Sequence, residues 1–249
     1  MIARFILAVL LVGCLANVAY CTGGYDKKDE TDLYTLRLRV PAEVMSIEPL
    51  KRDIITRYKK AADQTKANAV ESKKERPGEF RRLALDTRWQ VTFDNAAVLS
   101  VSGYSYEDQG GAHPNGYFEA IVWDKKAHRA VPIDTLFNKN QAANALQAIA
   151  TAAQKSWISI YKKQSGETPS QDLLEQSKLG ITPTAKAMKN YALTHAKGQT
   201  SVNGIVLLYG EGEIWPHALG EFRISVPVAV FSQYLKPEWR ATFQLTPSR

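Results

Sequence analysis

Alternating apolar and polar side chains predict strands in several parts of the chain. Residues 34–40 alternate and end at Pro41, and residues 86–93 alternate again, because successive side chains of a strand point to opposite faces. Residues 98–106 and 116–123 follow after connections of only a few residues. Connections this short join antiparallel neighbours. The pattern therefore predicts an antiparallel meander.

Helical periodicity is strongest in residues 141–163, where apolar side chains recur every three or four positions. This pattern predicts a long helix that ends at Gly166. A second apolar stripe begins near Ser46, which can cap a helix that has Pro49 in its first turn. Residues 64–82 are polar, and we expect a loop or a frayed helix end there.

The last third of the chain returns to strands. Ser170 can cap a short helix for which Gly180 is the expected left-handed terminator. Strands are predicted at residues 187–193, 204–209 and 222–228, with a helical turn over 231–235. Elements in this order predict an α+β fold, in which helices pack on antiparallel sheets.

The N-terminus carries the only strongly apolar run, residues 5–12, which is too short to span a bilayer as a helix. Small residues then precede Cys14, an arrangement that resembles the bacterial lipobox, in which the cysteine is lipidated after cleavage. We expect a signal peptide over residues 1–13, lipidation of Cys14 and a tether over 14–33. Ordinary cleavage near Ala16 is the alternative.

The remaining chain divides into a small N-terminal α/β segment, residues 34–82, and a larger C-terminal domain, residues 83–249. Cys14 and Cys21 are the only cysteines, so the domain needs no disulfide and offers no thiolate metal site. A lipid anchor places the protein in the cell envelope. The residue after Cys14 is Leu15 and not aspartate, which favours the periplasmic side of the outer membrane in a Gram-negative organism.

The formal net charge is +7, and residues 48–88 hold 12 basic and 7 acidic side chains. This region is interpreted as a solvated helix face and a charged loop, with a contact to anionic lipid as the alternative. A nucleic-acid partner is not expected, because export argues against it and no aromatic residues interleave with the basic ones.

Two glycine-rich segments, residues 104–116 and 209–220, each lie between two predicted strands. Their histidines, His113 and His217, could meet and form a metal site or an acid–base pair with nearby carboxylates. The chain has no His-x-x-x-His pair, nucleophile elbow or phosphate-binding loop motif. We therefore expect no metal, no cofactor and no enzymatic activity, and expect His113 to shape its loop through hydrogen bonds to backbone carbonyls.

Acidic residues gather in and around these segments, in a chain that is basic overall. The acids are Glu107, Asp108, Glu119, Glu211, Glu213 and Glu221, with no lysine or arginine in residues 103–123 or 204–222. If the segments cluster, they form an acidic rim with aromatic residues available, a combination that suits a protein contact. In the alternative interpretation, the aromatics belong to the core and the acids are merely solvated.

Four short motifs resemble one known family. They are Gly-Gly-Ala-His at 110–113, Leu-Phe at 136–137, Pro-His-Ala-Leu-Gly at 216–220 and Val-Pro at 226–227. Their order and spacing over residues 84–235 resemble the RsiV-like extracellular domain family. That family includes the ectodomain of a lysozyme-binding anti-sigma factor and an accessory domain of the peptidoglycan deacetylase PdaC. The resemblance implies a binding role and no catalytic residues of its own.

Together these features predict a non-catalytic binding domain on an exported lipoprotein, attached to the membrane through its N-terminal lipid. The resemblance suggests lysozyme as the ligand, and cell-wall material such as peptidoglycan is also considered. The candidate binding residues are Glu107, Asp108, His113, Glu211, Glu213, Trp215, Pro216 and His217. The alternative is a metal-dependent or acid–base hydrolase of the cell envelope that uses the His113 and His217 loops.

Overall fold

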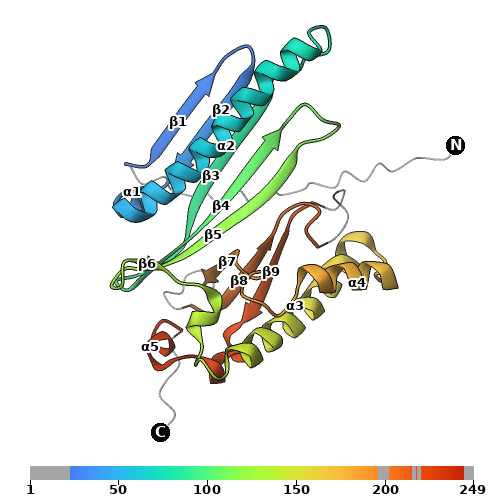
Figure 1. Ribbon diagram of the computed structural model, residues 1–249. Coiled ribbons are helices and arrows are strands. Elements are labelled where there is room, and N and C mark those ends of the chain that lie inside the picture. Colours follow the sequence, from blue (N-terminus) through green and yellow to red (C-terminus); the bar gives the residue numbers. More distant parts are fainter. Residues whose placement is uncertain (1–22, 196–201, 215–216, 218–219, 244–249) are drawn as a thin grey trace, which may run out of the picture.

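The computed structural model describes residues 23–195, 202–214, 217 and 220–243 (Figure 1). A first sheet holds six strands in the order β1-β2-β3-β4-β5-β6. They are β1 (Tyr25–Glu30), β2 (Tyr34–Val40), β3 (Leu83–Asp94), β4 (Val98–Asp108), β5 (Asn115–Asp124) and β6 (Arg129–Ala130). Strands β3, β4 and β5 pair antiparallel in sequence order, which confirms the predicted meander.

The first sheet is mixed, because β2 and β3 run parallel, with Leu36 opposite Leu85. The connection between them contains α1 (Ala42–Met45) and α2 (Glu48–Glu75). A helical crossover of this length is what a parallel pair requires. The expectation of purely antiparallel sheets is therefore wrong at this one pair.

Helix α2 also continues through residues 64–75, where a loop or frayed end was expected. Thr65 and Ala69 are buried against the sheet, and this packing stabilises turns that are mostly polar in sequence. Ser46 does not cap α2; it follows α1, and its hydroxyl donates to the carbonyl of Glu43 at 2.7 Å. Pro49 does lie in the first turn of α2, as predicted.

Two expected boundaries differ from the structure. The predicted tether, residues 14–33, contains β1, which pairs with β2 along its length. The predicted division between residues 82 and 83 falls between two paired strands of one sheet, because β2 precedes it and β3 follows it. Residues 34–82 are therefore part of the same layer as β3, β4 and β5.

A second sheet contains β7 (Tyr191–Thr194), β8 (Gly204–Tyr209) and β9 (Phe222–Pro227), all antiparallel. Strand β7 is shorter than the predicted 187–193 segment and begins later. Between the sheets in sequence lie the 3₁₀ turn η1 (Ile133–Leu136), α3 (Ala142–Ser165) and α4 (Gln171–Gly180). Short turns η3 (Val228–Val230), η4 (Ser232–Tyr234) and α5 (Pro237–Arg240) follow β9.

The helix ends agree with the sequence predictions in two of three cases. Gly166 ends α3 with φ of 76°, and the Ser170 hydroxyl accepts from the backbone N–H of Leu173 at 3.3 Å to cap α4. Gly180 is not a left-handed terminator, because it is the last helical residue. A Cβ there would lie 2.3 Å from the Ile214 side chain and 2.9 Å from the Glu213 carbonyl oxygen, so close packing explains this glycine.

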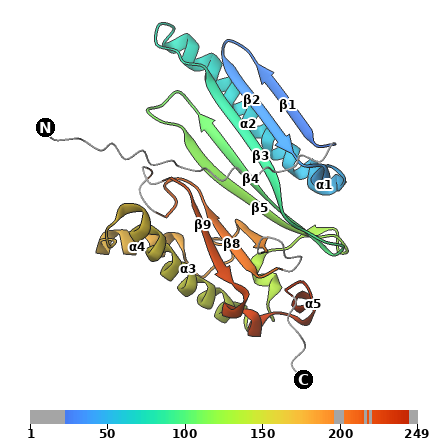
Figure 2. The same cartoon turned by 180° about the vertical axis from the view of Figure 1, so that it is seen from behind.

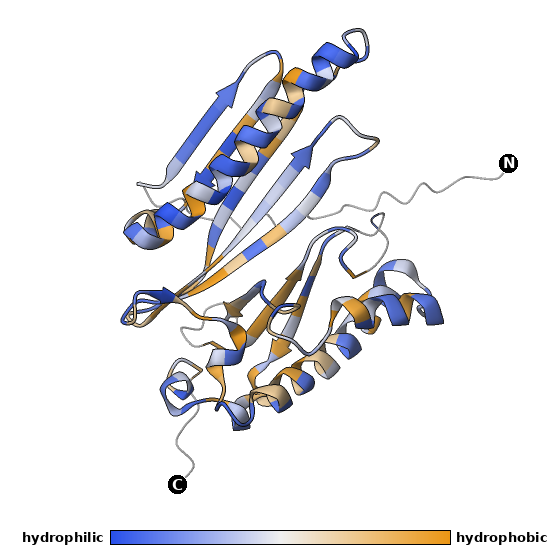
Figure 3. Ribbon diagram, viewed as in Figure 1, coloured by the Kyte–Doolittle hydropathy of each residue, from blue (hydrophilic) through white to orange (hydrophobic). Residues whose placement is uncertain are grey.

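The layers run from α2 through the first sheet and the second sheet to α3. Helix α2 lies in front of the first sheet in Figure 1 and behind it in Figure 2. Between α2 and the sheet lies one core that includes Leu38, Ile54 and Trp89. A larger core lies around the second sheet and α3 and includes Trp157 and Phe222. Figure 3 shows the second sheet as mostly hydrophobic and β1 as hydrophilic. Within the described ranges, every helix is too short or too polar to span a bilayer.

Candidate functional site

The two glycine-rich loops predicted from the sequence lie against each other. One connects β4 to β5, and the other connects β8 to β9 in the second sheet. The backbone N–H of Glu211 donates to the carbonyl of Gly116 at 3.0 Å. In return, the N–H of Gly116 donates to Oε2 of Glu211 at 3.1 Å. These reciprocal bonds join the two sheets at the place where both loops begin or end.

Glycine permits this close approach. A Cβ on Gly210 would lie 2.6 Å from the carbonyl oxygen of Gly116 and 2.9 Å from Cα of Tyr117. Both atoms belong to the backbone, so no side-chain rotation could relieve the clash. Gly110 and Gly212, within the two loops, each adopt φ of 76°, a left-handed conformation that other residues rarely take.

His113 and His217 meet, as the sequence suggested. Their ring centroids are 4.2 Å apart with planes inclined by 35°. Nε2 of His217 lies 3.0 Å from Oε2 of Glu211 and 3.3 Å from Oδ1 of Asn115. The expected role of His113 was a bond to backbone carbonyls, and the structure instead shows it packed on the second histidine. The rings therefore help to hold the loops together.

This arrangement provides a histidine–carboxylate pair, which could accept and donate protons. Among the described residues, no serine, threonine or cysteine hydroxyl or thiol bonds to either imidazole. In the same part of the chain, no three His, Cys, Asp or Glu side chains are arranged to hold a metal ion. The site thus has one element of acid–base chemistry, without an adjacent nucleophile.

The loop acids shape the loops that carry them. Glu107 accepts from Nε2 of Gln109 at 2.7 Å, and Asp108 accepts from the N–H of Gly110 at 2.8 Å. Glu213 accepts from the N–H of Gly210 at 2.9 Å. These three acids are therefore not simply solvated, because each accepts a hydrogen bond from its own loop.

The acidic rim is less uniform than the sequence suggested, because three arginines from outside these segments or from their edge reach it. Arg57 of α2 pairs with Glu119 at 3.1 Å, and Arg223 of β9 lies 3.5 Å from Glu221. Arg81 donates to the carbonyl of Gly111. Arg57 and Arg81 are distant in sequence, so charge counts within each loop could not reveal them.

The aromatic residues near the loops divide between core and surface. Tyr104 is partly buried and packs on the buried ring of Phe118, with centroids 5.1 Å apart. Burial, assisted by the neighbouring carboxylates of Glu221 and Glu211, raises the pKa of Tyr104 to about 12. Tyr106 is exposed. Trp215 and Pro216, two of the predicted binding residues, lie outside the described residues, as does Cys14.

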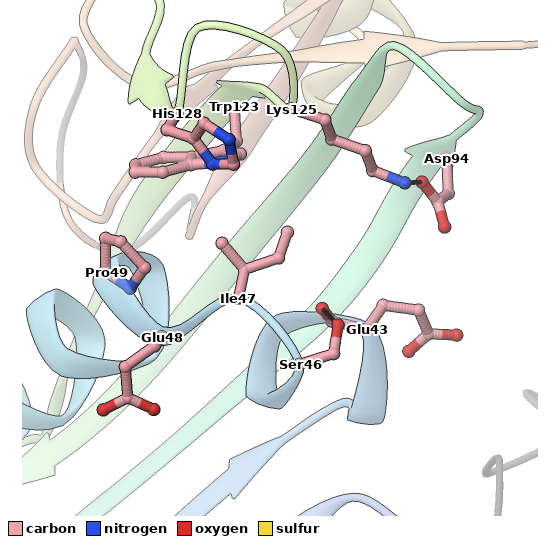
Figure 4. Close-up of a pocket in the computed structure, with 9 residues that line it drawn as sticks. All are labelled: Glu43, Ser46, Ile47, Glu48, Pro49, Asp94, Trp123, Lys125 and His128. Atoms are coloured by element: carbon pink, nitrogen blue, oxygen red, sulfur yellow. Dashed lines mark hydrogen bonds and ion pairs between the residues drawn. The ribbon is translucent and has the colours of Figure 1, made fainter.

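A cleft that the sequence did not indicate lies at the opposite end of the first sheet. It has a volume of about 400 Å³ and lies between the α1–α2 corner and the turns that follow β3 and β5 (Figure 4). Trp123 is buried in it, and Lys125 forms an ion pair with Asp94. His128 is exposed there with φ of 51°. The cleft is formed by segments far apart in sequence, so no local motif marks it.

Comparisons with known proteins agree with this architecture. Residues 134–229 match the family model described as a protein of unknown function (DUF3298). A DUF3298 crystal structure from Bacteroides fragilis has a TM-score of 0.57 at 14% identity, covering 87% of this chain and 93% of that one. One from Pseudomonas aeruginosa PAO1 has a TM-score of 0.57 at 13% identity, covering 86% and 92%. The fold is thus the α+β fold of DUF3298 structures.

The curated sequence relatives do not indicate a function for this chain. The chain is 25% identical over 140 residues to immunogenic protein MPB64 of Mycobacterium bovis and to immunogenic protein MPT64 of Mycobacterium tuberculosis. The match covers 56% of this chain and 51% of each relative, so the chain spans about half the length of the curated relatives it matches. Their names describe immunogenicity and no ligand. The DUF3298 match contains the second of the two joined loops.

Proposed function

We propose that this chain is a non-catalytic binding module of the cell envelope, attached to the membrane by lipid on Cys14. Its ligand contacts the joined loops, residues 107–116 and 211–220. The observation that carries this proposal is the reciprocal hydrogen bonding of Gly116 and Glu211, which holds loops from two different sheets as one surface. Loops fixed by a rigid scaffold are common sites of binding.

The proposed ligand is a cationic protein, with lysozyme as the candidate, or cell-wall material as the alternative. The RsiV-like resemblance supports lysozyme, because two of the four motifs that carry it, at 110–113 and 216–220, lie in the two joined loops. The charge of the loops also supports it. Glu107, Asp108 and Glu213 accept hydrogen bonds only from neutral groups, so they attract a cationic partner and raise its rate of association.

The first experiment measures binding of the chain to immobilised hen egg-white lysozyme at several salt concentrations. Affinity should fall as salt rises, because the Debye length is only about 10 Å at 0.1 M. The double variant Glu211→Gln/Glu213→Gln keeps acceptor oxygens for the loop hydrogen bonds and removes two charges. It should mainly slow association.

The matched control is Glu48→Gln/Glu238→Gln, which removes two exposed charges near α1 and α5, away from the loops (Figure 1). This control should associate at nearly the wild-type rate. Equal slowing by both double variants would mean that only net charge matters, and would reject the loops as the binding surface. Absence of binding at low salt would reject lysozyme as the ligand.

The role of Trp215 provides a second, independent measurement. An aromatic anchor at a protein contact acts mainly on dissociation, because most effects of contact mutations are on that rate. Trp215→Ala should therefore speed dissociation from lysozyme with little change in the association rate. An unchanged dissociation rate would remove Trp215 from the proposed surface.

One observation favours a different function. The 3.0 Å contact of His217 with Glu211 is a histidine–carboxylate pair that could serve acid–base hydrolysis in the cell envelope. Release of soluble fragments from purified peptidoglycan, lost in His217→Gln, would establish this alternative. If wild-type protein and His217→Gln both release nothing, the non-catalytic proposal stands.

A further inference from the structure

A basic groove lies on the face of the first sheet that α2 does not cover. Side chains alternate along each strand, so Leu38 and Trp89 face the helix while their neighbours face the other way. Where the second sheet leaves this face open, a groove of about 390 Å³ is lined by residues of β2, β3, β4, β5 and β9. Its arginines are Arg39, Arg88 and Arg223. We call this the arginine groove.

Positive charge exceeds negative charge in the arginine groove. Asp86 is the one acidic side chain among the described residues that line it, and it accepts from Nη2 of Arg39 at 2.5 Å. Nε of Arg39 is buried and has no hydrogen-bond partner among the described residues. A buried donor of this kind is costly unless another acceptor reaches it. The groove thus offers the unpaired Nε of Arg39 beside the guanidinium groups of Arg88 and Arg223, the second of which also lies 3.5 Å from Glu221.

The arginine groove also offers an aromatic surface and neutral polar groups. Tyr106 is 40% exposed at its edge, which is high for a large aromatic side chain of a sheet. The Arg223 guanidinium lies 4.9 Å from the ring centroid of Phe118, so this ring positions the charge. Nε2 of Gln90 donates to Oγ of the buried Ser102 at 3.2 Å, and the half-buried amide of Gln90 keeps further hydrogen-bonding capacity for hydroxyls.

We propose that the arginine groove binds a saccharide that carries an oxyanion, either a carboxylate or a phosphate. The planar fork of an arginine matches both anions with two parallel hydrogen bonds. The sugar ring would lie on Tyr106, and the amide of Gln90 would meet its hydroxyls. A groove of this volume accommodates one or two sugar units. This site adjoins the joined loops, because Tyr106 of the groove pairs with Gly116. Its ligand chemistry differs from that of the proposed protein contact, and the sugar titration does not depend on that contact.

Calorimetric titration of the purified full chain with defined sugars tests the proposal. Digalacturonate represents the carboxylate source and glucose 6-phosphate the phosphate source, while digalactose and glucose are their neutral counterparts. At least one charged sugar should bind, and its neutral counterpart should bind at least about 10-fold more weakly, the effect of losing one charge-assisted hydrogen-bonded pair. The charged sugar that binds shows whether the groove takes a carboxylate or a phosphate.

Variants then locate the site. Arg88→Gln and Arg223→Gln should each weaken binding of the charged sugar about 10-fold or more. Arg88→Lys should bind the sugar only partly as well as wild type, because lysine keeps the charge and lacks the planar pair of donors. Tyr106→Ala should weaken binding several-fold while Tyr106→Phe preserves it. Arg52→Gln removes the same charge from the exposed side of α2 and should have no effect. Binding of neither charged sugar, or equal weakening by Arg52→Gln and Arg88→Gln, would overturn the proposal.

Discussion

At the scale of single residues, the joined loops depend on where side chains are missing. Gly116 and Gly210 come together so closely that the carbonyl of one occupies the place where a Cβ of the other would be. Gly111, five residues before Gly116 in the same loop, has only a carbonyl oxygen at 3.9 Å from its would-be Cβ. Adding a methyl group should therefore cause a clash at Gly210 and none at Gly111.

Gly210→Ala should separate the loops and lower the free energy of unfolding by about 1–3 kcal/mol, the usual cost of forcing an extra methyl into a packed region. Gly111→Ala in the partner loop is the matched control and should change stability by less than about 0.5 kcal/mol. Chemical denaturation of both variants measures the difference. Equal stability of the two proteins would show that the loops are not held together as described.

Tyrosine burial predicts the response of the protein to alkaline pH. The pKa of Tyr104 in the folded state is about 12, above its ordinary value of 10.0, and burial also raises the pKa of Tyr191. The unfolded chain therefore releases these protons at lower pH than the folded chain. Their contribution to stability is complete below about pH 10 and is lost as pH rises through the folded-state pKa.

In Tyr104→Phe, the denaturation midpoint should consequently fall less steeply between about pH 10 and pH 12 than in wild type, since one raised pKa is gone. Denaturation series at several pH values measure this slope. An unchanged slope would mean that Tyr104 ionises equally readily in both states. The comparison of slopes remains informative even if the substitution lowers stability at neutral pH.

The sequence predicted the residues that lie within the two loops, but not the residues that reach the site from other parts of the chain. Spacing and glycine content indicated that His113 and His217 could meet, and they do. The sequence could not indicate that Arg57 and Arg81 reach the loops, because they come from α2 and from the connection that precedes β3. The arginine groove was missed for the same reason: Arg39, Arg88 and Arg223 are neighbours only after the strands pair.

At the scale of elements, periodicity located most helices and strands and failed where packing outweighed polarity. Residues 64–75 look solvated, yet they extend α2 because Thr65 and Ala69 fit against the sheet. The same helix makes β2 and β3 parallel, which alternation alone cannot reveal. A single alanine such as Ala69 adds little to an apolar pattern in the sequence. In the structure it is fully buried, and a larger or charged side chain would not fit there.

Ala69→Glu should accordingly destabilise the protein by roughly 2–3 kcal/mol, because it places an unpaired charge against the sheet. Ala67→Glu, two residues earlier on the exposed side of α2, is the control and should be nearly neutral. Thermal melts and the helical signal in circular dichroism measure both. Similar melts for the two variants would indicate that this part of α2 does not pack on the sheet.

At the scale of the whole molecule, the two cores share three strands of the first sheet, β3, β4 and β5. Leu99 and Val101 of β4 belong to the core under α2, whereas Val98 of the same strand belongs to the core of the second sheet. Strand β5 is divided likewise, with Ile121 in the first core and Val122 in the second. The division expected at residue 83 would therefore separate one core from half of its side chains.

A chain that begins at residue 83 should consequently fail to fold as an independent domain. It lacks α2 and β2, so Trp89, Val101 and Ile121 would face water, and exposed apolar patches of this kind lead to association. A chain that begins at residue 23 keeps every described strand and should melt in one cooperative transition at the wild-type temperature. Calorimetry and light scattering of the two fragments measure these outcomes. A cooperative melt of residues 83–249 near the wild-type temperature would show that the core around the second sheet and α3 stabilises the domain by itself. Residues 34–82 would then be an accessory layer.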